Sequence, residues 1–176
     1  ALYWVSFQRA QFPNGRYLGV LGGLILIFIL MGKIMAASDI LAYWFPLAAL
    51  SLLLAVVYDT RFSILITVLL AGLIGFISPN SLELAVYLAA GGILSVLTLK
   101  DTQRMAAFFR AGILAAVGYF VVIIVYWLIS ETEPNPIDTA LPALYALGNG
   151  LISSALTLAG FYILGGIFGI VTILQL

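Results

Sequence analysis

The residues best suited to chemistry in this sequence are polar side chains within one apolar run near its C-terminal end. The run contains Asn149, followed by Ser153, Ser154 and Thr157, which could form a polar patch facing the interior of a helix bundle. Such a patch can bind a substrate or an ion, or it can hydrogen-bond neighbouring helices. Hydrogen bonding between helices is the commoner use of such residues, and we favour it here.

Residue types for catalysis and metal binding are otherwise scarce. The sequence has no histidine and no cysteine, so the commonest acid–base group, the commonest metal ligand and every thiolate site are missing. No carboxylates are spaced to meet on one helix face. None falls at the centre of an apolar run, which is where proton- or cation-coupled transporters carry the acidic residues of their ion relay. We therefore predict no catalytic, cofactor-binding or metal-binding residue within these 176 residues.

The charged residues fall mostly in the connections between apolar runs. Asp59 and Arg61 flank a short turn, for which a solvated ion pair of little energetic weight is the default interpretation. Lys100, Arg104 and Arg110 belong to the most basic connection. This cluster either only sets the orientation of the chain or also binds anionic headgroups or a cytoplasmic domain, and the sequence leaves both open.

The composition is that of an integral membrane protein. Hydrophobic residues make up 64% of the chain and charged residues 8%, with a mean hydropathy of +1.22. A soluble domain has about 45–50% apolar and about 25% charged residues. Every polar connection is short, so residues 1–176 form a single transmembrane domain in contact with the lipid bilayer. The formal net charge of zero gives no general attraction for nucleic acid.

The apolar runs predict an all-α fold, a polytopic membrane helix bundle with six complete spans and the end of a seventh at the N-terminus. A span needs about 20 residues. The complete spans are expected at residues 17–35, 40–58, 62–77, 82–99, 105–129 and 139–160. Residues 1–7 are too short to span, which fits either the last turns of a helix or a short interfacial helix. The last apolar run continues beyond its span, and we expect a bend or an interfacial continuation from Gly160.

Small residues and one proline predict how the spans pack. Small residues recur at four-residue spacing, which lets helix backbones approach closely, and we favour packing within the chain over a dimer face. The pairs are Gly19 and Gly23, Ala71 and Gly75, Gly91 and Ser95, Gly112 and Ala116, and Gly165 and Gly169. Pro46 falls in the first turns of its expected span, where a helix tolerates proline.

The charges divide unequally between the two sides of the predicted bundle. With alternating spans, one side collects six basic and two acidic residues, and the other collects one basic and five acidic residues. The basic side comprises Arg9, Arg16, Arg61, Lys100, Arg104 and Arg110, with Asp59 and Asp101. Short positive connections stay in the cytoplasm, so this side and the C-terminus are expected there.

Several short stretches, taken in order, resemble one known family. They are Phe45-Pro-Leu-Ala-Ala at a span start, Tyr58-Asp-Thr-Arg61 followed by Phe-Ser-Ile-Leu-Ile-Thr, Gly91-Gly92 before the basic connection, Arg110-Ala-Gly112 after it, Asn149-Gly-Leu-Ile-Ser, and the closing Phe168-Gly-Ile-Val-Thr172. Their order and spacing resemble the transmembrane region of bacterial seven-transmembrane receptors with an intracellular HD hydrolase domain. The resemblance covers most of the chain.

The resemblance implies a location and partners within a longer chain. In that family the membrane region lies in the bacterial inner membrane, between an extracytoplasmic sensory domain and a cytoplasmic HD domain that hydrolyses cyclic di-AMP with a pair of divalent metal ions. Ala1 would then fall inside the first of seven spans, and the HD domain would follow Leu176. The catalytic His and Asp of the family have no counterpart in these residues.

The sequence thus favours a membrane-anchoring and signal-transmitting domain of a metal-dependent HD phosphodiesterase receptor. One alternative is the substrate-binding subunit of an energy-coupling-factor-type transporter, which has a similar size and span number. Another is a small structural subunit of a membrane protein complex. A homodimer or a larger membrane complex stays open in each case.

Overall fold

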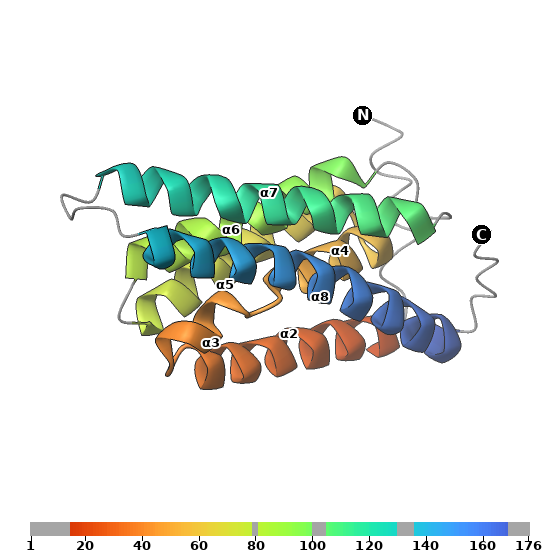
Figure 1. The fold of residues 1–176 in the computed structure, drawn as a ribbon. Coiled ribbons are helices and arrows are strands. Elements are labelled where there is room, and N and C mark those ends of the chain that lie inside the picture. The colour runs from red at the N-terminus through yellow and green to blue at the C-terminus, as the bar shows by residue number, and fades with distance from the viewer. Residues whose placement is uncertain (1–14, 79–80, 100–104, 130–135, 169–176) are drawn as a thin grey trace, which may run out of the picture.

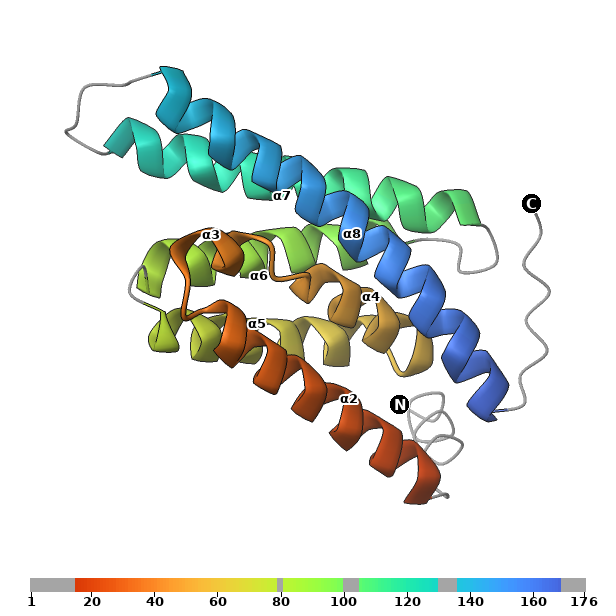
Figure 2. The same cartoon turned by 60° about the horizontal axis from the view of Figure 1, so that its bottom comes forward.

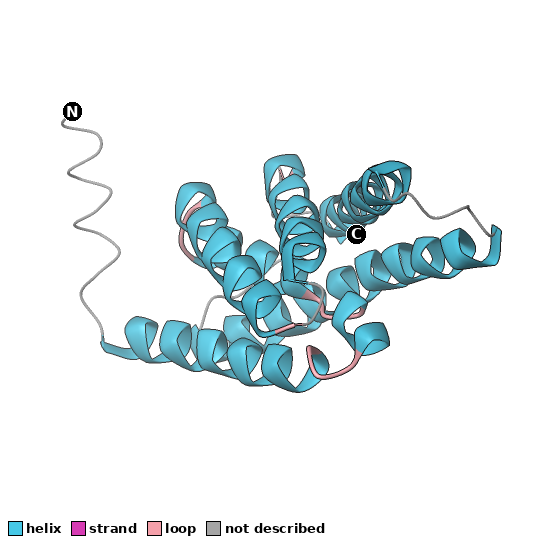
Figure 3. Ribbon diagram, turned by 90° about the vertical axis from the view of Figure 1, so that its left-hand side faces the viewer, coloured by secondary structure: helices cyan, strands magenta, loops and turns pink. Residues whose placement is uncertain are grey.

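The computed structural model describes residues 15–78, 81–99, 105–129 and 136–168, and this part of the chain is helical without any strand. The helices are α2 (Gly15–Met35), α3 (Asp39–Tyr43), α4 (Leu47–Val57), α5 (Thr60–Ile77), α6 (Ser81–Thr98), α7 (Met105–Ile129) and α8 (Pro136–Phe168). Figure 3 shows the bundle from one end. The expected all-α fold is confirmed.

Helix α6 lies at the centre of the packing, in contact with α4, α5 and α7. Helix α8 crosses α7 obliquely and also contacts α4, whereas α2 lies at the edge and touches α5 and α4 more lightly (Figures 1 and 2). Helices α2, α5 and α7 begin at the end of the bundle where α8 finishes (Figure 1). Exposed Arg61 and Arg110 therefore share one end, as the division of charge predicts.

The outer surface of the bundle is apolar, which suits a lipid environment. Helix α4 is buried from Leu47 to Leu54, because neighbouring helices cover it on all sides. By contrast, Phe76 on α5 is 88% exposed, and Leu128 and Ile129 at the end of α7 are also exposed. In water such surfaces would be costly, whereas in a bilayer they contact the acyl chains.

Four stretches are long and apolar enough to cross a membrane, and two apolar helices among the described residues are shorter. The four stretches are Ile40–Val57, Thr60–Ile77, Ala106–Ile129 and Ala143–Leu164, and the shorter helices are Gly19–Met35 and Leu82–Thr98. Each overlaps one of the expected spans. The protein is therefore a multi-pass membrane protein. The count of six complete spans stays a prediction, because only four stretches have the length of a span, and the seventh span stays one because residues 1–7 lie outside the described residues.

One local expectation was wrong. The run at 40–58 is interrupted between Tyr43 and Leu47, where a continuous helix was expected. The continuation expected from Gly160 is helical, because α8 runs through this residue to Phe168. A Cβ atom at Gly160 would come within 2.8 Å of Leu53, so this glycine allows close contact between α8 and α4.

Most of the small-residue pairs pack within the chain, as expected. The pairs buried in the bundle are Ala71 and Gly75, Gly91 and Ser95, and Gly112 and Ala116. Gly19 and Gly23 differ, because both are exposed and a Cβ atom on either would meet nothing within 4 Å. For Gly165 the surroundings, and for Gly169 the whole residue, lie outside the described residues.

Candidate functional site

The interruption between α3 and α4 leaves backbone carbonyls inside the bundle without their usual helical partners. Pro46 has no N–H to donate, and it disfavours the helical conformation at Phe45. The amide of Leu47 turns back to the carbonyl of Phe45 (2.9 Å), and the amide of Ala49 donates to the carbonyl of Pro46 (3.0 Å). The Tyr43 carbonyl, which in a continuous helix would accept from Leu47, must therefore find another donor.

Asn149 on α8 supplies that donor. Its Nδ2 atom donates to the carbonyl of Tyr43 (2.8 Å) and to the carbonyl of Phe45 (3.1 Å). Its Oδ1 atom accepts from the hydroxyl of Ser153 one turn later (3.1 Å), and the residue is fully buried. The side-chain amide of one helix thus caps the broken helix of another, with both of its N–H groups and its carbonyl oxygen in hydrogen bonds.

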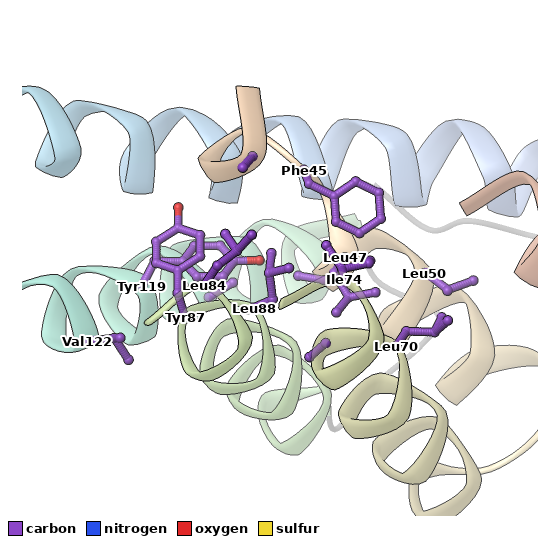
Figure 4. Packing of buried hydrophobic residues seen from close by; sticks show 14 of the residues in the cluster. Phe45, Leu47, Leu50, Leu70, Ile74, Leu84, Tyr87, Leu88, Tyr119 and Val122 are labelled. Carbon is purple, nitrogen blue, oxygen red and sulfur yellow. The ribbon is translucent and has the colours of Figure 1, made fainter. Parts of the chain in front are cut away.

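A row of tyrosines approaches the same carbonyl from α3 and α6. The hydroxyl of Tyr87 donates to the Tyr43 carbonyl (3.0 Å), and the hydroxyl of Tyr43 donates to Oε1 of Glu83 (2.7 Å). The rings of Tyr43 and Tyr87 meet edge to face at 5.1 Å. On its other side, Tyr87 stacks on Tyr119 of α7 at 4.3 Å between ring centroids (Figure 4). Helices α6, α7 and α8 therefore meet at the break between α3 and α4, and we call this meeting point the junction.

The hydroxyl of Tyr119 is the exception in this network. It is fully buried and makes no hydrogen bond with any described residue. The amide of Ala48 and the hydroxyl of Ser153 lie near it but do not reach hydrogen-bond geometry. Figure 4 shows the hydroxyl directed toward α8. An unpaired buried hydroxyl costs about 1–3 kcal/mol, so the described arrangement holds Tyr119 at an energetic disadvantage.

Glycines bring α7 and α8 into direct backbone contact beside this network. A Cβ atom added to Gly112 would come within 2.5 Å of the Gly150 carbonyl oxygen and would also collide with the Ser154 hydroxyl. A Cβ atom added to Gly150 would collide with the Gly112 carbonyl. The Ser154 hydroxyl shares its hydrogen between the carbonyls of Phe108 (3.2 Å) and Gly150 (3.0 Å). The position of α8 against α7 is thus fixed over a short stretch.

A second polar cluster joins α4 to α5 and α6. The hydroxyls of Ser51 and Thr67 are 2.6 Å apart, and the hydroxyl of Ser63 donates to the carbonyl of Ser51. All three residues are buried. A Cβ atom on Gly92 of α6 would come within 2.5 Å of Thr67, so the three helices meet here at close range.

We expect Thr67→Val to weaken this cluster only moderately. The Ser51 hydroxyl keeps the carbonyl of Leu47 as an acceptor (3.0 Å), so the loss should be about 0.5–1.5 kcal/mol in the free energy of unfolding. SDS titration in mixed micelles measures it. The matched control is Thr98→Val, whose hydroxyl bonds within its own helix and is expected to change stability by less than about 0.5 kcal/mol. Equal effects at both positions would contradict the interhelical role.

The comparisons with known proteins give the family of the chain. The model of the family described as "7TM receptor with intracellular HD hydrolase" matches residues 1–172. The chain belongs to this family. No curated protein and no solved structure matches it. In receptors of this family, as the description says, the membrane domain is joined to an intracellular HD hydrolase, so the junction lies in the membrane part of a receptor.

The structure of this receptor domain bears out the favoured interpretation of the polar patch. Asn149, Ser153, Ser154 and Thr157 are all buried, and Asn149 and Ser154 bond to other helices. Among the described residues, no group of three His, Cys, Asp or Glu side chains is placed to hold a metal ion.

The charged residues of the receptor domain are only partly described. Asp59 caps the N-terminus of α5, because its side chain accepts a hydrogen bond from the amide of Arg61 (3.2 Å). It therefore does more than form a solvated ion pair at the turn. Arg110 is exposed on α7. Lys100 and Arg104 lie outside the described residues, so the two interpretations of the basic cluster stay open.

Sequence reasoning missed two parts of the junction. The first is the interruption before Pro46, for which the proline itself was an available signal because it disfavours helix at the residue before it. The second is the stack of Tyr87 on Tyr119. In the sequence, Tyr87 and Tyr119 look like ordinary residues of two apolar runs. Nothing in the local sequence of either indicates that α6 and α7 meet at these positions.

Proposed function

We propose that these residues form the membrane-anchoring and signal-transmitting domain of a receptor whose intracellular HD hydrolase is a cyclic di-AMP phosphodiesterase. The observation that carries the proposal is the family match over residues 1–172. It favours the receptor over a transporter subunit or a structural subunit, because neither alternative has a comparable observation behind it.

The arrangement of α8 supports a transmitting role. It is the last described helix, and it contacts both α7 and α4. Through Asn149 it holds the broken segment between α3 and α4. A change of packing on the opposite side of the membrane that moves the α3–α4 segment would therefore act on α8, and α8 would pass the movement to a hydrolase that follows it.

The proposal assigns the sides of the membrane and the metal chemistry as follows. The end carrying Arg61 and Arg110 faces the cytoplasm of a bacterial cell, together with the C-terminal end of α8. The pair of divalent metal ions belongs to the HD domain, where it supplies an activated water for phosphodiester hydrolysis. An extracytoplasmic sensory domain of the same chain supplies the input.

Hydrolysis by the full-length receptor in lipid bilayers tests the proposal. With Mn²⁺ present, we expect hydrolysis of cyclic di-AMP and much slower hydrolysis of cyclic di-GMP as a substrate control. We also expect the rate to differ between the full-length receptor and its hydrolase part released from the membrane domain. Failure to hydrolyse cyclic di-AMP would refute the substrate assignment. Equal rates with and without the membrane domain would refute signal transmission and leave only anchoring.

A further inference from the structure

The hydrogen bonds that hold α8 to the α3–α4 break can be exchanged without leaving a carbonyl unpaired. Asn149 donates to the carbonyls of Tyr43 and Phe45. Each carbonyl also has a second donor, which is the Tyr87 hydroxyl for Tyr43 and the Leu47 amide for Phe45. If Asn149 withdraws, both carbonyls keep one hydrogen bond, so α8 can release the break without exposing an unsatisfied backbone group to the apolar interior.

A new partner for α8 already lies beside the break. The Tyr119 hydroxyl is fully buried, makes no hydrogen bond within the described part of the chain, and is directed toward α8 (Figure 4). Ser153 is one of its nearest polar neighbours, and the Ser153 oxygen still has lone pairs free after donating to Asn149. A small rotation or shift of α8 would bring Ser153 within reach of Tyr119.

We propose that α8 has two settings, between which these side chains act as a latch. In the first, which the structure describes, Asn149 binds the break and Tyr119 is unpaired. In the second, Tyr119 donates to Ser153, and Asn149 releases the carbonyls of Tyr43 and Phe45. Pairing the buried Tyr119 hydroxyl offsets part of the free energy lost with the two Asn149 hydrogen bonds. A moderate difference in how a signal stabilises the two settings therefore changes their relative populations. The biological meaning of the latch rests on the proposed signal transmission, but its existence does not.

The test observes the position of α8 directly. Tyr162 on α8 is 80% exposed, and these 176 residues contain no cysteine. A Tyr162→Cys variant of the full-length receptor, with any cysteine elsewhere replaced, is labelled with a trifluoromethyl group and studied by ¹⁹F NMR in lipid nanodiscs. Two settings of α8 give two resonances in slow exchange, or one averaged resonance whose position reports the populations in fast exchange.

Two substitutions should move the populations in opposite directions. Tyr119→Phe keeps the ring and its stack and removes only the hydroxyl, so the second setting should become about threefold to twentyfold less populated. Asn149→Ala should enrich the second setting by a similar factor, and adding Tyr119→Phe should reverse that change. The matched control is Tyr126→Phe, the same change two turns later on α7, which should leave the spectrum unchanged.

Identical spectra for Tyr119→Phe and Tyr126→Phe would overturn the latch, as would shifts of Tyr119→Phe and Asn149→Ala in the same direction. If Asn149→Ala does not fold, Tyr119→Phe still decides, because it removes one oxygen and leaves the packing intact. No hydrolysis is needed for this result. A receptor whose α8 responds as expected but whose hydrolysis is independent of the membrane domain would keep the latch and lose the proposed function.

Discussion

Replacing Gly112 with alanine should destabilise the receptor domain by about 3 kcal/mol or more, although it adds a single methyl group. The added carbon would lie within 2.5 Å of the Gly150 carbonyl oxygen and against the Ser154 hydroxyl. The backbone of α8 cannot yield as a flexible side chain would, so α7 and α8 must separate along their contact. SDS titration of the receptor in mixed micelles gives the free energy of unfolding.

The control for this prediction is Gly22→Ala on α2, where an added Cβ meets nothing within 4 Å. There alanine makes the unfolded chain less flexible than glycine does, so the free energy of unfolding should stay unchanged or rise by about 0.5–1 kcal/mol. The double variant Gly112→Ala with Ser154→Ala should recover little, because the clash with the Gly150 carbonyl remains. A Gly112→Ala variant as stable as the parent would show that the two helices are not in backbone contact.

Replacing Asn149 with aspartate should be more damaging than replacing it with alanine. Aspartate keeps the shape of asparagine but puts an oxygen where Nδ2 now donates to two carbonyls. A carboxylate buried opposite carbonyl oxygens is uncompensated, so we expect a loss of about 3–5 kcal/mol in the free energy of unfolding. For Asn149→Ala we expect a loss of about 1–3 kcal/mol, because only hydrogen bonds and some packing disappear.

The order of these two losses is the informative quantity. If Asn149 merely filled space, alanine would be the worse substitution, because it leaves a cavity that aspartate does not. Thermal unfolding of both variants in the same lipid and detergent mixture ranks them. A larger loss for Asn149→Ala would show that the amide donors to Tyr43 and Phe45 matter less than the volume of the side chain.

The helices could be predicted well from the sequence, whereas the contacts between them at the junction could not. Helix bounds follow from apolar runs separated by short polar turns, and such runs are local, so α5 and α7 begin and end within two residues of their expected places. The burial of the polar patch was also predictable, because lipid excludes such groups. The break before Pro46 was missed although the proline was a signal for it, because a proline in the first turns of a helix is ordinarily tolerated.

What distinguishes this proline is its distant partner. Asn149 lies 104 residues after Phe45 in the chain, and only the folded arrangement brings its amide to the freed carbonyls. The same holds for Tyr119, whose ring lies directly against Gly91 of α6. No local pattern links these positions. For Gly160, likewise, flexibility was the natural expectation from sequence, whereas close approach to Leu53 is the role that the fold gives it.

The capping of the α3–α4 break by α8 has a consequence for biogenesis. Ribosomes deliver α3 and α4 to the membrane long before α8 emerges, so until then Asn149 cannot serve the carbonyls of Tyr43 and Phe45. Helix α4, buried over Leu47 to Leu54 in the finished bundle, also lacks part of its cover until α8 arrives. The interior of this domain is therefore completed last, and a nascent chain that stops before α8 exposes an unfinished core to membrane quality control.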